Sequence, residues 1–207
     1  MKNESWTIFG AGDLICDIID AIESRGGRAT QLVRNMELTR KTIDKLPNDL
    51  KVIDLPDFKP SGEACFFGFS DPNKAPFLQL LKQYNLRFSN LVHQFSYVPA
   101  SVEMGQGNFV GAGVVLATKV RLGNFNYINR MASLGHDTEI ADFNQIGPGC
   151  VIASNCKIGN RNNISTNSAV ITGRSVNDDI TVGAGAVVVR DIRESGTYVG
   201  VPAHKLP

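Results

Sequence analysis

Between residues 98 and 188, an apolar side chain stands at every sixth position. The step does not slip once, so sixteen consecutive positions share the pattern. They are Val98, Met104, Val110, Leu116, Leu122, Ile128, Leu134, Ile140, Ile146, Ile152, Ile158, Ile164, Val170, Val176, Val182 and Val188. An amphipathic helix repeats every 3.6 residues and a half-buried strand every two, so neither explains this period. A six-residue period is typical of a parallel β-helix.

The residues around these positions fit a prism built from six-residue segments. We expect each segment to form one flat side, three segments to form one coil, and the apolar residue to point inward. Glycine often follows the apolar residue, as at Gly135 and Gly147, and we expect glycine and asparagine to ease the corners by accepting positive φ. Small or apolar residues often stand two positions before it, as Cys150 and Cys156 do, and we expect both thiols inside the prism.

The first ninety residues follow a different pattern, in which apolar strands alternate with helical stretches. We expect strands at "WTIFGAG", "RATQLVR", "KVIDLP", "EACFFGF" and "RFSNLVH", and helices at "DLICDIIDAIESRGG" and "APFLQLLKQYN". Such alternation predicts a parallel sheet covered by helices. The predicted fold class is therefore α/β plus all-β. A small Rossmann-like domain spans 1–94, and a β-helix domain with a carboxyl-terminal tail spans 95–207.

Composition narrows the function classes. The net charge of +1 gives no reason to expect nucleic acid or an anionic membrane as a partner. No apolar run reaches the roughly 18 residues of a membrane span, and the first residues lack the layout of a signal peptide. The four cysteines show no CxxC spacing. We expect a reduced, cytoplasmic protein.

Four stretches resemble one family along nearly the whole chain. "LGHDTEIADFNQIGPGCVIAS", "YVGVPAHKLP", "IFGAG" and "RFSNLVHQFSYV" are similar to the bacterial nucleotide-sugar acetyltransferases. That group includes the bacillosamine- and perosamine-pathway N-acetyltransferases and the sialic acid O-acetyltransferases. The resemblance implies a left-handed β-helix, acetyl-CoA as cosubstrate without a metal, and a homotrimer with active sites between subunits.

The resemblance assigns the acetyl transfer to His136 and Asp137. Histidine is the side chain best suited to accept a proton near neutral pH, and an adjacent carboxylate stabilises its charged form. The resemblance therefore implies that His136 is the general base and Asp137 its tuning partner. A solvated corner histidine without a role is the alternative.

Further residues are implied as the binding site for acetyl-CoA. A backbone N–H at Ser154 would hold the thioester carbonyl. Gln145 stands where the family often has a second histidine; it can donate or accept a hydrogen bond but cannot shuttle a proton. The corner of Ile171, Thr172 and Gly173, the stretch 183–187, and Val201 with Pro202 match the positions of the pantetheine arm and adenine.

The amino-terminal site departs from the family pattern. Gly10, Ala11 and Gly12 still form a turn that could accept phosphate oxygens, and Arg34 could pair with a phosphate. The family often reads "GAGGHG" here and ends its second strand with paired acids, whereas this chain reads "GAGDLIC" and "QLVRN". Asp13 is better explained as a helix N-cap than as a ligand of phosphate. These departures argue against a UDP sugar bound in the usual way.

The predicted function is acetyl-CoA-dependent N-acetylation of a nucleotide-linked amino sugar of the 4-amino-4,6-dideoxy type. O-acetylation of a sugar such as sialic acid is the nearest alternative, and a non-catalytic scaffold of the same fold is another. A zinc enzyme of the γ-carbonic anhydrase type would need three converging histidines. His93 precedes the prism and His204 lies in the tail, which argues against that class.

Overall fold

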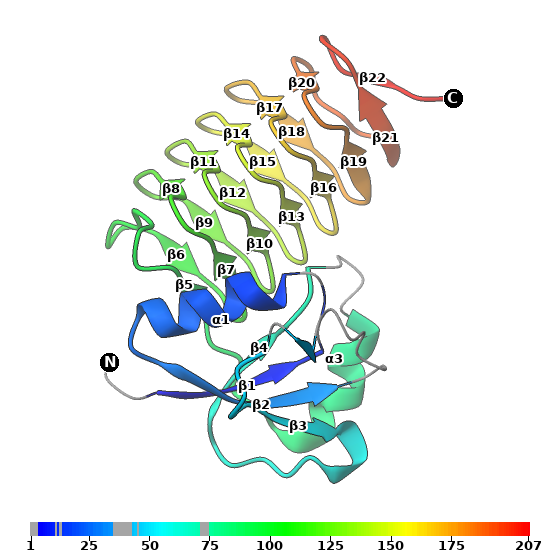
Figure 1. The fold of residues 1–207 in the computed structure, drawn as a ribbon. Coiled ribbons are helices and arrows are strands. Elements are labelled where there is room, and N and C mark those ends of the chain that lie inside the picture. The colour runs from blue at the N-terminus through cyan, green and yellow to red at the C-terminus, as the bar shows by residue number, and fades with distance from the viewer. Residues whose placement is uncertain (1–3, 11, 13, 35–42, 45, 71–74) are drawn as a thin grey trace.

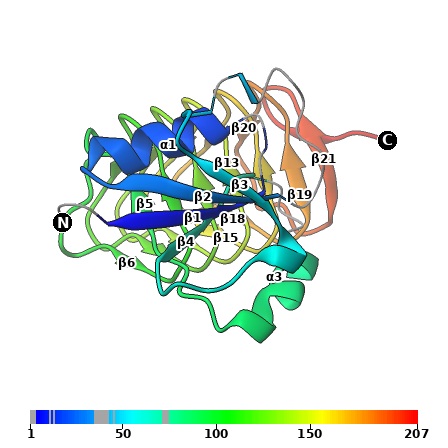
Figure 2. The ribbon, with the colours of Figure 1, turned by 60° about the horizontal axis from the view of Figure 1, so that its bottom comes forward.

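The chain folds into an amino-terminal α/β domain and a long parallel β-helix (Figure 1). The computed structural model describes residues 4–10, 12, 14–34, 43, 44, 46–70 and 75–207. In Figure 1 and Figure 2 the amino-terminal domain lies alongside the first coils of the prism, where Phe109 and Tyr127 share a buried cluster with it. None of the helices in the described part of the chain combines the length and apolar character needed to cross a bilayer.

The amino-terminal domain is built on a four-stranded parallel sheet. Its strand order is β3 (Lys51–Asp54), β2 (Arg28–Arg34), β1 (Ser5–Phe9) and β4 (Ala64–Phe67). Its helices are α1 (Ile15–Ser24), α3 (Ala75–Leu81) and the short 3₁₀ turns η1 (Leu55–Asp57) and η2 (Lys82–Tyr84). The four strands and the helices α1 and α3 lie in stretches that the sequence predicted, whereas η1 begins in the last residues of the predicted strand "KVIDLP".

Helix α1 lies between the sheet and the prism (Figure 1). Ile15, Ile18, Ile19 and Ile22 are buried, at the spacing of one helical face, in a cluster that also includes aromatic residues of the prism. The N-cap position is Leu14, which makes no side-chain cap hydrogen bond. The residue predicted as the cap, Asp13, lies outside the described residues.

The last strand expected from the first ninety residues is shorter than predicted. Only β5 (Leu91–Val92) forms, and it pairs with a strand of the prism rather than with the amino-terminal sheet. Phe88 makes a single bridge to Cys65 of β4. The stretch "RFSNLVH" therefore connects the two sheets.

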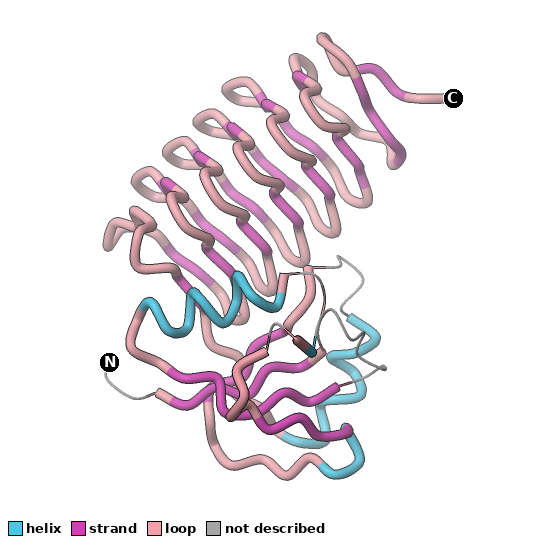
Figure 3. The backbone as a smooth tube through the Cα atoms, in the orientation of Figure 1, coloured by secondary structure: helices cyan, strands magenta, loops and turns pink. Residues whose placement is uncertain are grey.

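The prism has three flat faces. Face 1 contains β5, β7 (Phe109–Val110), β10 (Tyr127–Ile128), β13 (Gln145–Ile146), β16 (Asn163–Ile164), β19 (Ile180–Val182), β21 (Gly196–Val199) and β22 (His204–Lys205). Face 2 contains β8 (Val115–Leu116), β11 (Ser133–Leu134), β14 (Val151–Ile152), β17 (Ala169–Val170) and β20 (Val187–Val188). Face 3 contains β6 (Glu103–Met104), β9 (Arg121–Leu122), β12 (Glu139–Ile140), β15 (Lys157–Ile158) and β18 (Ser175–Val176). Figure 3 shows these short strands alternating with corners in each coil.

The six-residue repeat is confirmed as the core of the prism. Every repeat position from Val110 to Val188 is buried in one continuous cluster, and Val98 and Met104 are partly buried against it. Cys150 and Cys156 are also buried in it, as expected. Strands pair with partners 18 residues away, for example Ile128 with Ile146, so three segments complete one coil.

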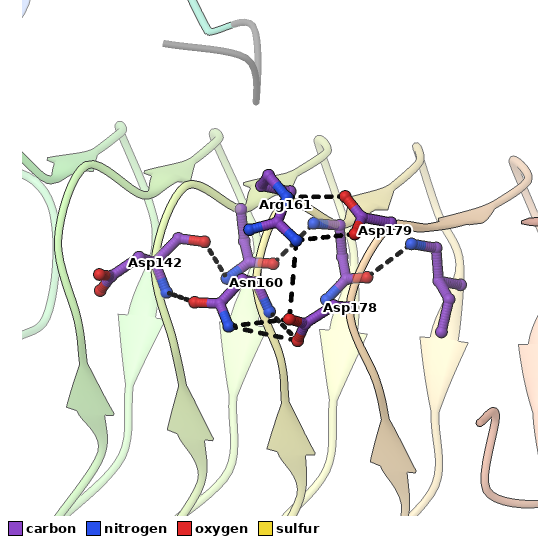
Figure 4. Close-up of polar contacts among 8 residues, drawn as sticks. Asp142, Asn160, Arg161, Asp178 and Asp179 are labelled. Carbon is purple, nitrogen blue, oxygen red and sulfur yellow. Dashed lines mark hydrogen bonds and ion pairs between the residues drawn. The ribbon is translucent and has the colours of Figure 1, made fainter. Parts of the chain in front are cut away.

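Columns of polar residues also run along the prism, which the sequence analysis did not anticipate. Asn108, Asn126, Asn144 and Asn162 are buried, and the side-chain oxygen of each of the first three accepts from the backbone N–H of the next. A second, more exposed column contains Asp142, Asn160 and Asp178 (Figure 4). Each column satisfies backbone donors where the chain turns between faces 3 and 1.

The glycines that follow the apolar residues serve close packing. Gly135 and Gly147 do not have positive φ, contrary to the expectation. A Cβ atom on Gly135 would lie 2.4 Å from the backbone nitrogen of Ser154 in the next coil, and one on Gly147 would lie 2.7 Å from that of Thr166. Positive φ occurs later in each corner and is adopted there by residues as varied as Lys119 and Phe143.

Candidate active site

His136 stands at the corner between faces 2 and 3, after β11 and before β12. The same place in neighbouring coils is held by Thr118, Ser154 and Thr172, each 18 residues from the next. Adjacent strands lie about 4.8 Å apart, so these residues form a column along the prism. Three of the predicted site residues, His136, Ser154 and Thr172, therefore lie in one line.

The side chains of His136 and Asp137 contact each other. Nδ1 of His136 lies 2.8 Å from a carboxylate oxygen of Asp137, and both side chains are about half exposed. Because a carboxylate only accepts hydrogen bonds, this contact places a proton on Nδ1, and in the neutral imidazole the lone pair is then on Nε2. The hydrogen bond from His136, aided by the charge of Lys119, lowers the pKa of Asp137 below its ordinary 3.8. The pair therefore has the arrangement of a general base and its orienting carboxylate.

Ser154 lies one coil above His136, and the coils approach closely here because residue 135 is glycine. The backbone N–H of Asn155 donates to the carbonyl oxygen of His136 at 3.0 Å, which fixes the two corners together. Within the described residues, no acceptor takes the N–H of Ser154 itself. That donor is available for a ligand, as a carbonyl-binding role requires.

Apart from Gln145, the remaining residues predicted to bind acetyl-CoA lie higher along the prism. Ile171, Thr172 and Gly173 form the corner above Ser154, and the N–H of Gly173 donates to the Ser154 carbonyl at 3.0 Å. The turn with Val201 and Pro202 lies over β20, because Val187 exchanges backbone hydrogen bonds with Gly200 and Ala203. The stretch 183–187 crosses from face 1 to face 2 and ends in β20. These segments all border face 2.

Gln145 is separated from His136 within one chain. It begins β13 on face 1, and face 1 lies opposite the corner that holds His136. Its neighbour on that face is Tyr127, whose ring is buried in the cluster formed with α1. Gln145 therefore lies beside the amino-terminal domain.

The turn after β1 is held closely against the end of β4. Gly10 has a φ of +74° and donates to the Val33 carbonyl, while Gly12 donates to the Gly68 carbonyl, both at 2.8 Å. A Cβ on Gly68 would lie 1.9 Å from the Gly10 carbonyl oxygen. Ala11, predicted to bind substrate, lies outside the described residues.

Arg34 is engaged with a residue that the sequence analysis did not consider. Its Nε and Nη2 atoms lie 2.5 and 3.0 Å from the two carboxylate oxygens of Asp54, at the end of β3. This contact lowers the pKa of Asp54. Asp54 lies within the predicted strand "KVIDLP", and no feature of the sequence pairs it with Arg34.

The three histidines lie on separate parts of the chain. His93 is buried at the base of the prism, with Nε2 at 3.0 Å from a carboxylate oxygen of Asp20 on α1. His204 is exposed in β22, at the far end. Within one chain they do not converge with His136, as the zinc-enzyme alternative would require. Among the described residues, no three His, Cys, Asp or Glu side chains are gathered as metal ligands.

Comparison with known proteins identifies structural relatives. No protein-family model matches the chain, and no curated protein matches it. A variant of perosamine N-acetyltransferase from Caulobacter crescentus, solved with CoA and GDP-perosamine, superposes with a TM-score of 0.89 at 25% identity, covering 98% of this chain and 97% of that one. The acetyltransferase domain of PglB from Neisseria gonorrhoeae, solved with acetyl coenzyme A, gives 0.87 at 24% identity over 99% and 100%. WeeI from Acinetobacter baumannii gives 0.68 at 17% identity, over 99% and 100%.

These matches confirm the resemblance at the level of the whole fold. The chain has the fold of the acetyl-CoA-dependent nucleotide-sugar N-acetyltransferases, with both the α/β domain and the β-helix included in the superposition. The predicted fold class is therefore correct.

Proposed function

We propose that this protein transfers the acetyl group of acetyl-CoA to the amine of a nucleotide-linked 4-amino-4,6-dideoxy sugar, with His136 as general base. One observation carries the proposal: on a fold shared with such an enzyme, Nδ1 of the corner imidazole is held by Asp137. Nε2 is thereby left as the proton acceptor. The amino-terminal turn differs in sequence from the family pattern, and this difference concerns the nucleotide of the acceptor rather than the transfer of the acetyl group.

The residues of the corner suffice for the chemistry. The amine nitrogen attacks the thioester carbonyl carbon while Nε2 of His136 takes a proton from it. The N–H of Ser154 stabilises the oxyanion that develops on the carbonyl oxygen. As the tetrahedral intermediate collapses, the C–S bond breaks and His136 returns the proton to the sulfur, giving the amide and free CoA. Asp137 holds the imidazole in the required tautomer throughout.

We further propose a homotrimer in which neighbouring chains complete each site. Face 2 carries outward-pointing apolar residues, with Val115 and Val151 about half exposed. Charged residues such as Arg121 and Glu139 hold the equivalent positions on face 3, so face 2 is the better contact surface. Since the amino-terminal domain contacts face 1, its turn lies across the prism from His136 of the same chain. A neighbour packed at face 2 would bring the two halves together.

The activity is tested by following thiol release from acetyl-CoA with a panel of nucleotide-linked 4-amino sugars. His136→Ala should reduce kcat by on the order of 10²–10⁴. Asp49→Ala, which removes an exposed side chain that pairs with Arg28 at the amino end of β2, is the control and should keep full activity.

Three outcomes would contradict the proposal. Equal turnover by the native protein and His136→Ala would exclude His136 as the base. Thiol release only with hydroxyl acceptors would make the protein an O-acetyltransferase. No binding of acetyl-CoA in calorimetry would leave the fold as a scaffold without this activity.

A further inference from the structure

The pair of Arg34 and Asp54 occupies a defined place in the amino-terminal sheet. The two residues are in register at the carboxyl ends of β2 and β3. In Figure 1 the arrowheads of these strands point to the same side of the molecule. Gly10, which begins the turn after β1, donates to Val33, the residue before Arg34. The pair and the glycine turn therefore share one edge of the sheet.

This edge is where open parallel sheets bind nucleotides. In such folds the phosphates lie at the glycine turn after the first strand, and a carboxylate near the end of the second strand accepts hydrogen bonds from the ribose hydroxyls. Here the second strand ends in Arg34, which can only donate. The nearest described carboxylate at this edge is that of Asp54, one strand further along, and Arg34 holds it in place.

We propose that Asp54, oriented by Arg34, accepts the ribose hydroxyls of the acceptor nucleotide, so that the acceptor is a ribonucleotide sugar. This inference rests on the proposed function, because it names the class of acceptor for that site. The two-point contact with Arg34 uses one lone pair on each carboxylate oxygen and leaves others for further donors. The Asp54 side chain is half exposed, so a ligand can reach it.

An exposed ion pair often has no role beyond the surface. The same sheet provides a pair that serves as a control for this explanation. Arg28 and Asp49 form an ion pair of similar exposure at the amino end of β2, away from the glycine turn. If Asp54 were only a surface partner of an arginine, its removal would affect nucleotide binding no more than the removal of Asp49.

The test measures binding of GDP and 2′-deoxy-GDP, and of UDP and 2′-deoxy-UDP, to the full-length protein by calorimetry. Within each pair the ligands differ only in the 2′-hydroxyl. A hydrogen bond to a charged group should favour the ribonucleotide by on the order of tenfold or more. Asp54→Ala should remove this preference, Arg34→Ala should reduce it, and Asp49→Ala should leave it unchanged.

Equal affinity for ribo- and deoxyribonucleotides would overturn the inference. So would a preference that survives Asp54→Ala, or the absence of binding by any of the four nucleotides. Thiol release measured in parallel separates this result from the proposed function. A preference that depends on Asp54, found without any acetyl transfer, supports the inference and contradicts the proposed function. If Asp54→Ala leaves acetyl transfer unaffected, the result supports the proposed function and contradicts this inference.

Discussion

Nδ1 of His136 and a carboxylate oxygen of Asp137 lie 2.8 Å apart, although the two residues are neighbours in the chain. Adjacent side chains on a strand point to opposite faces and cannot meet in this way. They meet here because the chain turns the corner at Asp137, whose φ is +58°. The conformation of the corner thus creates the orienting contact.

The first prediction concerns the charge of Asp137. Asp137→Asn keeps the shape of the side chain and tolerates the left-handed backbone, but removes the carboxylate that fixes the imidazole tautomer. We expect kcat for acetyl transfer to fall on the order of ten- to a thousandfold, while circular dichroism and the melting temperature stay nearly unchanged. Unaltered kcat in this variant would show that Asp137 does not orient His136.

The sequence was sufficient to predict the prism and its inward residues. A six-residue apolar period has one simple structural solution, and buried positions such as Ile128 and Ile164 confirm it. The buried asparagine column was not predicted, because the side-chain oxygen of Asn126 meets the N–H of Asn144 only after the coils are stacked. Asparagine in a corner is equally well explained by its tolerance of positive φ.

Part of the candidate site was predictable because the repeat is regular. His136, Ser154 and Thr172 share a column because they are 18 residues apart, and that spacing is visible in the sequence. The partner of Arg34 was not predictable, because the pairing register of β2 and β3 depends on a connection of many residues. Gln145 follows His136 by nine residues, which is half of an 18-residue coil. The two residues therefore lie on opposite sides of the prism.

The second prediction compares two glycines at the corner between faces 2 and 3, at different positions within it. Gly135→Ala would place a Cβ 2.4 Å from a backbone nitrogen of the next coil, which cannot move alone. Gly173→Ala meets no atom within 4 Å, but its φ of +73° costs a residue with a side chain about 1–2 kcal/mol. We expect Gly135→Ala to lower the free energy of unfolding by more than Gly173→Ala in urea titrations. The reverse order would show that φ, rather than coil contact, requires glycine here.

The third prediction concerns the buried asparagine column. Asn144 accepts from the N–H of Asn162 at 2.9 Å, and its own amide donates to Asn126 at 3.1 Å. Asn144→Leu leaves the buried N–H of Asn162 without its acceptor and removes the side-chain donor to Asn126, so we expect a loss of roughly 2–4 kcal/mol in the free energy of unfolding. The matched control is Asn163→Leu, next to the column but on the outer surface of β16, with an expected change below about 1 kcal/mol. Equal losses in the two variants would contradict a special role for the column.

The fourth prediction is a pH dependence at the exposed ion pair of Arg161 and Asp179 (Figure 4). Both contacts are 2.7 Å, and they lower the pKa of Asp179 below its ordinary 3.8. A carboxyl with a lowered pKa stabilises the folded state above its unfolded pKa, and this contribution is lost as the pH falls through the folded value. Asp179→Asn should therefore melt slightly below the native protein from pH 7 to about pH 4, as expected for an exposed pair. Below that range the two melting curves should converge, and a constant difference down to pH 2 would contradict the assignment.

The last prediction tests whether neighbouring chains share each site. His136→Ala removes the base, and Gly12→Asp places a negative charge in the turn proposed to bind the acceptor phosphates. Each variant alone should be nearly inactive. If one chain supplies His136 and its neighbour supplies the turn, every mixed trimer of the two variants should keep about one third of its sites, one of three, with both parts intact. If both parts of a site came from the same chain, mixed trimers would have no intact site and would stay as inactive as the separate variants, which would exclude a shared site. Thiol release by doubly tagged, purified mixed trimers distinguishes the two arrangements.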